Sequence, residues 1–298
     1  MARTPRPDIL IYAINFAPEL TGAGRYTGDL AFGLAGLGRV VEVIAAPPHY
    51  PGWYVRASYS AMRYKSEEMH GVRVTRCPLL LPKNVAGIWR LVVPLSFAVS
   101  SAPVALWRIL RARPKSVVCV EPTLFVAPIA LIAAKIVGAR TLLHVQDLEI
   151  DAAFAVGHLK GDGLASRIAF GFERLVLSGF DEVVTISGQM AQRLRDKGVA
   201  EDRLTLVRNW VDTSKIKPLN RPSAYRQELG IADDDYVVLY SGQIGPKQAL
   251  HVVFEAAQAM AGAQEPSPGR RIVFVVAGEG PLKKEFLARY VHLPNVMI

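Results

Sequence analysis

The chain alternates short apolar runs with longer stretches in which apolar residues recur at helical spacing. The predicted strands are Ile9–Ile14, Val40–Ala45, Val72–Cys77, Ser116–Val120, Arg140–Val145, Glu182–Ile186 and Leu204–Val207, and the predicted helices are Gly24–Leu37, Gly87–Arg111, Phe125–Val137, Gly163–Ser178 and Gly188–Lys197. The strands are almost entirely apolar, as in a parallel sheet whose two faces are covered by helices. This pattern predicts an α/β fold with a doubly wound parallel sheet.

A polar segment at 209–222 interrupts the pattern and has the composition of a linker. We therefore expect an N-terminal domain at 1–208 and a second α/β domain at 223–298. The second domain's predicted strands are Tyr236–Ser241, Arg271–Ala277 and Asn295–Ile298, and its predicted helices are Lys247–Ala261 and Pro281–Tyr290. Three parallel strands cover only part of their surface, so we expect an incomplete domain and a C-terminally truncated protein. A small complete lobe is the alternative.

The composition agrees with a folded protein of two ordinary domains. Of the 298 residues, 51% are apolar and 20% are charged, which excludes a disordered chain. Cys77 and Cys119 lie in apolar runs, which favours buried free thiols and a reducing, cytoplasmic location. The run Ile9–Ile14 is shorter than the core of a signal peptide and predicts a first strand instead.

Positive charge is concentrated in one part of the chain. The net charge is +9, and the segment from Met69 to Val120 contains no Asp or Glu. Its cations are Arg73, Arg76, Lys83, Arg90, Arg108, Arg111, Arg113 and Lys115. Such a block suits an anionic partner (a nucleic acid, an acidic lipid or a phosphorylated substrate), and a solvated basic face explains it equally well.

The same segment contains a long uncharged run. Leu91–Trp107 has no charged residue and is flanked by Arg90 and Arg108, so its length is borderline for a membrane span. Pro94, Pro103 and the serines of the run argue against spanning, and we predict a kinked, largely buried helix. Tryptophans and arginines at its ends would also suit a helix that lies on an anionic membrane surface.

Two turns that contain glycine are candidate sites for a diphosphate. Gly22 and Gly24 follow the first strand, where free helix amides and a close backbone approach favour an anion. Gly242 and Gln243 follow the first strand of the second domain, and Lys247 is predicted in the first turn of a helix. A cation is unfavourable there unless an anion lies against it. An ordinary helix start and a solvated lysine are the alternatives.

Further candidates stand at the carboxyl ends of strands, where open α/β sheets bind their ligands. His144 ends the fifth strand and is the candidate catalytic residue, with a buried core histidine as the alternative. The candidate acceptor-binding residues are His49, Tyr50, Trp53, Glu121 and Asp147. Three of them carry rings on one loop, and aromatic faces suit sugars. Asp233–Asp235 precedes a strand at the opposite edge, so we expect no metal there.

Together these segments resemble the retaining GT-B glycosyltransferases of family 4, and the first domain is similar to enzymes of colanic-acid and O-antigen biosynthesis. The stretches that carry the resemblance are Asn15–Gly22, Ala46–Pro51, His144–Glu149, Tyr240–Lys247 and Val276–Pro281. The resemblance implies two Rossmann-like domains facing a cleft and no metal or cofactor. The implied donor-binding residues are Gly22, Gly24, Gly242, Gln243 and Lys247, and His144 would contact the transferred sugar. Gln243 stands where the family often has Arg, so more of the charge neutralisation would fall to Lys247.

The resemblance also implies a reaction and its setting. We expect a hexose to move, with retention, from a nucleotide-diphosphate sugar to a lipid-linked or saccharide acceptor, at the inner membrane face, in exopolysaccharide, capsule or O-antigen biosynthesis. The family's paired glutamates would lie beyond Ile298, so we expect this chain to be inactive alone. The alternatives are another GT-B-type sugar-nucleotide enzyme, such as an epimerase, and a basic nucleic-acid-binding protein. The second alternative lacks an aromatic-and-basic binding motif, so we expect no nucleic-acid partner.

Overall fold

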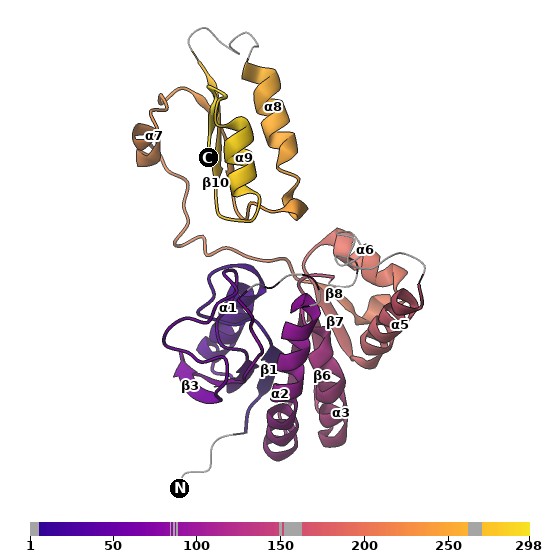
Figure 1. Ribbon diagram of the computed structural model, residues 1–298. Coiled ribbons are helices and arrows are strands. Elements are labelled where there is room, and N and C mark those ends of the chain that lie inside the picture. Colours follow the sequence, from indigo (N-terminus) through magenta and orange to yellow (C-terminus); the bar gives the residue numbers. More distant parts are fainter. Residues whose placement is uncertain are drawn as a thin grey trace. The chain divides into compact units, whose positions relative to one another are not determined.

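A computed structural model of the chain describes residues 6–83, 85, 87, 89–148, 151, 163–261 and 270–298. The chain divides into two compact units, Met1–Trp210 and Val211–Ile298 (Figure 1). The division falls at the start of the predicted linker. Each unit has its own parallel sheet and its own hydrophobic core.

In the described residues the first unit is built on an eight-stranded sheet with the order β3-β4-β2-β1-β5-β6-β7-β8. Its strands are β1 (Ile9–Ala13), β2 (Val41–Ala45), β3 (Lys65–Met69), β4 (Val72–Arg76), β5 (Ser116–Glu121), β6 (Arg140–Val145), β7 (Glu182–Thr185) and β8 (Leu204–Leu206). All pairings are parallel except that of β3 with β4. The sequence predicted every strand but β3, which is polar and largely exposed, as suits an antiparallel edge strand.

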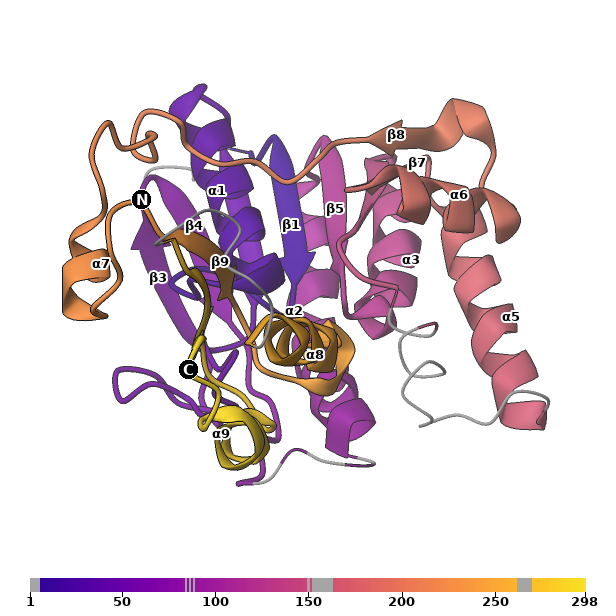
Figure 2. The same ribbon diagram turned by 90° about the horizontal axis from the view of Figure 1, so that it is seen from above.

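Helices cover both faces of this sheet. They are α1 (Gly22–Gly36), α2 (Trp89–Ala112), α3 (Ala127–Val137, after the 3₁₀ turn η1, Leu124–Val126), α5 (Leu164–Gly179) and α6 (Gly188–Asp196), and the 3₁₀ turn η2 (Glu201–Arg203) leads into β8. Leu10 and Tyr12 of β1 belong to the core under α2 and α3, whereas Ile11 and Ala13 belong to the core under α1. This alternation places α1 opposite the other helices, and Figures 1 and 2 show the resulting layers. The predicted doubly wound α/β fold is confirmed.

Local chemistry sets the ends of these helices. α3 ends where Gly138 takes a left-handed conformation with φ 69°, which a glycine adopts without steric cost. α6 begins after Ser187, whose hydroxyl oxygen accepts a hydrogen bond from the amide of Met190. Cys77 and Cys119 are buried free thiols as predicted, and burial raises the pKa of both, that of Cys77 to about 12.

Only one side of α2 is buried, so the prediction of a largely buried helix is wrong for the other side. Val93, Phe97 and Ile109 pack into the core, while Leu95 and Val99 are exposed. The helix packs against α3 and connects β4 to β5. By length and composition α2 is also the one helix in the described part of the chain that could cross a membrane.

The second unit has a parallel sheet with the order β11-β10-β9 in the residues described. Its elements are α7 (Ala224–Glu228), β9 (Tyr236–Ser241), the 3₁₀ turn η3 (Pro246–Gln248), α8 (His251–Ala261), β10 (Ile272–Ala277), α9 (Lys283–Tyr290) and β11 (Val296–Met297). Its core is aromatic: the ring of Phe254 on α8 stacks on that of Tyr290 on α9, with centroids 4.5 Å apart, and lies 4.8 Å from that of Phe286. The three predicted strands and two longer helices are present, and the short helix α7 was missed.

The predicted position of Lys247 in the first turn of an α-helix is wrong. Lys247 lies in the 3₁₀ turn η3, and α8 begins only at His251. Ala249 between them has a φ of 48°, in the left-handed region, which ends the turn before the helix starts. The dipole of α8 therefore gives no reason to expect an anion against Lys247. Its side chain lies outside the described part of the structure.

Candidate functional site

The candidate residues of the first unit gather at one edge of its sheet. The strand order places β1 between β2 and β5, with β6 next, so the carboxyl ends of these strands are neighbours. The turn into α1 follows β1, the loop with His49 follows β2, Glu121 ends β5 and His144 lies near the end of β6. Because this is the edge where open α/β sheets bind ligands, we treat it as the candidate site.

A buried carboxylate ties two of these segments together. Glu19, in the turn between β1 and α1, is 3% exposed. Its Oε1 accepts the backbone N–H groups of His49 at 2.9 Å and Tyr50 at 3.0 Å, and its Oε2 accepts Nδ2 of Asn15 at 3.0 Å. Such charge-assisted bonds are strong in a buried setting, so Glu19 fixes the aromatic loop against the first turn. Glu19 was not among the site residues predicted from the sequence, because nothing in its spacing indicated a partner thirty residues away.

The rings of the loop after β2 form a cluster. Trp53 lies 5.9 Å from His49 and 6.1 Å from Tyr50, measured between ring centroids. His49 is buried, and its Nδ1 donates to the carbonyl of Pro47 at 2.9 Å. Burial raises the pKa of the Tyr50 hydroxyl, and the charges of Glu19 and Asp147 add to this effect. The structure therefore brings His49, Tyr50, Trp53 and the exposed Asp147 after β6 into one neighbourhood.

The glycines of the first turn have packing reasons to be glycine. Gly22 has a φ of 61°, and a Cβ added there would lie 3.3 Å from Cε1 of Tyr50. A Cβ on the buried Gly24 would lie 2.9 Å from Cβ of Glu19 and would overlap its carboxylate. Both positions thus let α1 approach the loop that Glu19 holds. Contact of Gly22 and Gly24 with a donor diphosphate stays a prediction.

His144 is a buried, neutral imidazole. It is 4% exposed, and burial lowers its pKa to about 4. Its Nε2 accepts a hydrogen bond from Nε2 of Gln146 at 3.0 Å, and Oε1 of Gln146 accepts one from Nδ2 of Asn209 at 3.1 Å. Since Nε2 is the acceptor, the proton of the neutral ring is on Nδ1. Glu121, one strand away at the end of β5, is also buried. Catalytic contact by His144 stays a prediction, and Glu149 of the same motif lies outside the described residues.

In the second unit, two loops at the carboxyl ends of β9 and β10 support each other. The amide of Gly242 donates to Ala277 at 3.0 Å, and that of Ile244 to Glu279 at 2.9 Å. A Cβ on Gly278 or Gly280 would overlap backbone atoms of the loop after β9. The exposed Gly242 and Gln243 are therefore held in a fixed loop. Their contact with a donor, like that of Lys247, stays a prediction.

Much of the basic block is neutralised by acids from other segments. Arg73 and Arg108 pair with Glu42, at 2.5 and 3.6 Å, Arg76 pairs with Glu67 and Lys115 with Asp8. Four of the block's eight cations are paired in this way, so the block offers a polyanion less net charge than its sequence indicates. In the acidic turn Asp235 accepts the guanidinium of Arg271, and no group of three or more potential metal ligands occurs among the residues described.

Comparison with known proteins places the chain among glycosyltransferases. The family model for a glycosyl transferase 4-like domain matches residues 21–210. The WcaI protein of Escherichia coli (strain K12), a candidate colanic acid biosynthesis glycosyl transferase, is 42% identical over 278 residues, which are 91% of this chain and 66% of WcaI. A D-inositol 3-phosphate glycosyltransferase of Geodermatophilus obscurus is 34% identical over 158 residues, which are 50% of this chain and 33% of that protein. The chain thus spans just under two thirds of the length of WcaI.

Solved structures agree on the fold. The catalytic domain of starch synthase IV from Arabidopsis thaliana matches with a TM-score of 0.63 and 16% identity, covering 97% of this chain and 73% of that one. The Anabaena protein Alr3699/HepE matches with a TM-score of 0.56 and 14% identity, covering 97% and 68%. Both matches cover nearly the whole of this chain, and its fold is of the GT-B type. With the family model matched over most of its first unit, the chain belongs to the glycosyl transferase 4-like family.

Proposed function

We propose that this protein transfers a sugar from a nucleotide-diphosphate sugar to a saccharide or lipid-linked acceptor in extracellular polysaccharide assembly, with retention of the anomeric configuration. The observation that carries the proposal is the edge of the first unit, where Glu19 holds an aromatic loop at the same sheet edge as the buried His144, within the region that matches the family. Two comparisons support the donor and the pathway. Structures of HepE contain UDP or UDP-glucose, and WcaI is named for colanic acid biosynthesis.

The proposed chemistry follows from the groups available. The diphosphate binds at the loop with Gly242, Gln243 and Lys247, where the ammonium of Lys247 and backbone N–H groups stabilise the leaving group. In the first unit, Gly22 is the proposed contact to the phosphates of the donor. An oxygen of the leaving phosphate takes the proton of the acceptor hydroxyl. His144 is neutral near pH 7, so it acts as a hydrogen-bonding group to the transferred sugar and not as a cation.

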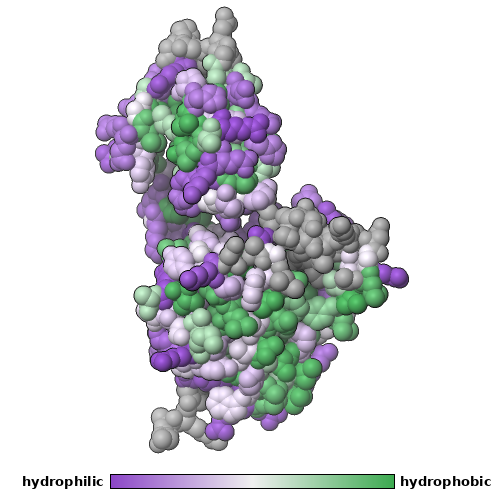
Figure 3. All heavy atoms as spheres, in the orientation of Figure 1, coloured by the Kyte–Doolittle hydropathy of each residue, from purple (hydrophilic) through white to green (hydrophobic). Residues whose placement is uncertain are grey.

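The apolar outer face of α2, α3 and α5 supports a lipid-linked acceptor and a peripheral membrane location. Figure 3 shows hydrophobic side chains gathered over these helices. The exposed large apolar residues of this lipid-facing surface are Leu91, Leu95 and Val99 on α2, Ile132 and Ile136 on α3, and Leu164, Ile168 and Leu175 on α5. Contiguous apolar surface of this kind marks an interaction site rather than ordinary solvent-exposed surface.

The charges of the same surface suit an anionic bilayer. α2 and α3 contain no Asp or Glu, and the single acid of α5, Glu173, is buried and paired with Lys197 at 2.6 Å. Lys135 on α3 and Arg167 and Arg174 on α5 are exposed cations at this face. A helix face with apolar residues and flanking cations binds in the interface of acidic lipids.

The test of the proposal is transfer itself. The full-length protein is purified and incubated with a panel of labelled UDP-, GDP- and ADP-sugars and with saccharide or lipid-linked acceptors, and the anomeric configuration of the product is read by NMR. Retention in a transferred product supports the proposal. Altered free sugar without an acceptor would favour an epimerase, and tight binding of nucleic acid with a steep salt dependence would favour a nucleic-acid-binding protein.

The role of Lys247 is tested in the same assay. We expect Lys247→Ala to lower kcat by about 100-fold, because an electrostatic stabiliser of the leaving group is lost. Lys215→Ala is the matched control, since Lys215 is 82% exposed and pairs only with Asp212 in the described structure. A kcat for Lys247→Ala within about twofold of the control would reject the phosphate role.

A further inference from the structure

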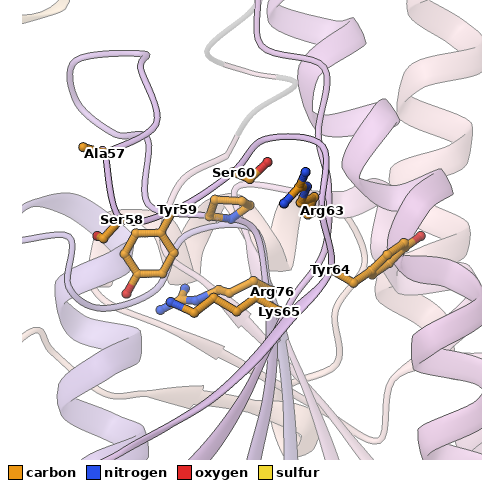
Figure 4. A pocket seen from close by; sticks show the side chains of 9 residues that line it. Ala57, Ser58, Tyr59, Ser60, Arg63, Tyr64, Lys65 and Arg76 are labelled. Carbon is orange, nitrogen blue, oxygen red and sulfur yellow. The ribbon is translucent and has the colours of Figure 1, made fainter.

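A pocket of about 290 Å³ opens beside the aromatic loop of the first unit (Figure 4). Most of its walls come from the end of the loop between β2 and β3 and from the start of β3 (residues 57–60 and 63–65). Pro47 and Arg76, the last residue of β4, complete the lining. Pro47 accepts the ring N–H of His49, and Arg76 donates to the carbonyls of Ala17 and Ala46. The pocket is therefore held by the same two turns, after β1 and β2, that form part of the candidate site.

The pocket carries more positive than negative charge. Arg76 is fully buried and donates to Oε1 of Glu67 at 2.7 Å, and Lys65 lies 3.4 Å from Oε2 of the same carboxylate. Burial opposes ionisation of Glu67, but Arg76 and Lys65 lower its pKa on balance, so Glu67 is ionised. One carboxylate thus faces two cations, one of them half exposed.

Arg63 adds a third cation at the mouth of the pocket. It is exposed, and within the described part of the chain it makes no hydrogen bond or ion pair. A guanidinium presents five N–H donors in a planar fork that matches a carboxylate or a phosphate. The hydroxyls of Ser58 and Ser60 line the same space. Arg63 can only donate, and the hydroxyl of Ser60, whose oxygen accepts the amide of Met62 at 3.2 Å, keeps its own proton to donate.

Two tyrosines give the pocket apolar faces. Tyr59 lies under both fixed cations, with Nζ of Lys65 4.5 Å and Cζ of Arg76 5.4 Å from its ring centroid. Tyr64 donates its hydroxyl to the carbonyl of Ser100 on α2 at 2.8 Å, which fixes that wall to the helix. Aromatic rings next to charged donors are the chemistry that holds a sugar carrying an acidic group.

We propose that this pocket binds an anionic group, a carboxylate or a phosphate, carried by a saccharide of the acceptor. Arg63 and Lys65 contact the acidic oxygens, and Tyr59 packs against the sugar ring. The identification of the bound saccharide as the acceptor rests on the proposed function. The preference of the pocket for an anionic sugar follows from the residues that line it.

The experiment is a calorimetric titration of the 298-residue chain with glucuronate, glucose 1-phosphate, inorganic phosphate and glucose. We expect at least one anionic sugar to bind more tightly than both glucose and inorganic phosphate. The better of the two anionic sugars identifies the acidic group. Arg63→Gln and Lys65→Gln should each weaken that binding by about tenfold or more. Arg56→Gln, an exposed arginine on the same loop outside the pocket, is the matched control and should change it by less than about twofold.

The proposal is overturned if glucose binds as well as the anionic sugars, if inorganic phosphate binds as tightly as both, if none binds, or if Arg56→Gln has the same effect as Arg63→Gln. Failure of the proposed function is distinguishable from these results. If the protein binds an anionic sugar through Arg63 but transfers no sugar from any nucleotide sugar, the pocket proposal stands and the proposed transferase function is rejected. If the protein is a transferase but Arg63→Gln leaves its KM for the acceptor unchanged, only the pocket proposal is rejected.

Discussion

His144 gives the first unit a pH-dependent stability whose sign and size follow from its burial. The pKa of this histidine falls from 6.5 to about 4 in the folded state. Between these values the unfolded chain binds a proton that the native state does not, so stability is fully present above pH 6.5 and is lost as the pH falls towards 4. At 1.36 kcal/mol per pKa unit, the loss from this one group is about 2 kcal/mol between pH 7.5 and 5.0. In His144→Gln the titrating ring is gone, and the new Oε1 can still accept the hydrogen bond from Gln146.

The assay is urea unfolding at the two pH values, followed by tryptophan fluorescence. All four tryptophans (Trp53, Trp89, Trp107 and Trp210) belong to the first unit, so the signal reports its unfolding. The wild type should lose about 2 kcal/mol more than His144→Gln on going from pH 7.5 to 5.0, since the other titrating groups contribute equally to both proteins. Equal losses, or an imidazole that titrates near 6.5 by NMR in the folded protein, would refute the reasoning.

Three further predictions test the site and the exposed apolar face of α2, α3 and α5. Gly24→Ala should lower the unfolding free energy of the first unit by about 1–3 kcal/mol, because the new Cβ meets Glu19. The control is Gly33→Ala on the same helix, whose Cβ meets nothing within 4 Å. An equal loss of unfolding free energy in the two variants would show that the contact with Glu19 is not the cause. Glu19→Gln should speed hydrogen exchange of the His49 and Tyr50 amides by about tenfold, as read by NMR, with the exposed Glu68→Gln as control; unchanged exchange would remove Glu19 from its role. Val99→Glu should reduce co-sedimentation of the protein with anionic vesicles at low salt by about tenfold. The control Leu37→Glu, next to α1 on the other side of the sheet, should leave co-sedimentation unchanged. If the wild type does not sediment with the vesicles, the proposed membrane association is rejected.

The sequence predicted the fold well where burial on both faces leaves a continuous apolar run. β1 and β5 are almost continuous apolar runs, whereas β2 contains Glu42 and β6 contains Thr141 and His144. All four strands were predicted to within a residue or so of their limits. β3 has only one neighbour and a polar sequence, so its pattern carried no signal. Helix limits were less predictable where one residue decides them, as the left-handed Ala249 does between η3 and α8.

The site was predictable in position but not in its internal contacts. Strand ends could be placed at one edge from the order of the elements alone, which assigned the loop with His49 and His144 to the same edge of the sheet. The partners of Glu19 and Arg76 could not be found in this way, because each bonds across 30 or more residues of sequence. The segment 69–120 appeared uniformly positive in the sequence for the same reason, because the acids that neutralise Arg73, Arg76 and Lys115 lie outside it.

The two buried charges at this edge indicate what the local structure is for. Glu19 receives backbone N–H groups of the loop after β2, and Arg76 donates to the carbonyls of Ala17 and Ala46, so one carboxylate and one guanidinium together fix the turns after β1 and β2. Burying a charge costs several kcal/mol, and apolar residues of similar volume often stabilise a protein as well or better. Stability alone therefore gives no reason for this arrangement. The need for a fixed loop geometry beside an open pocket does give a reason for it. The ring cluster and the proposed anion-binding wall can bind a sugar tightly only when both are held in place before the sugar arrives.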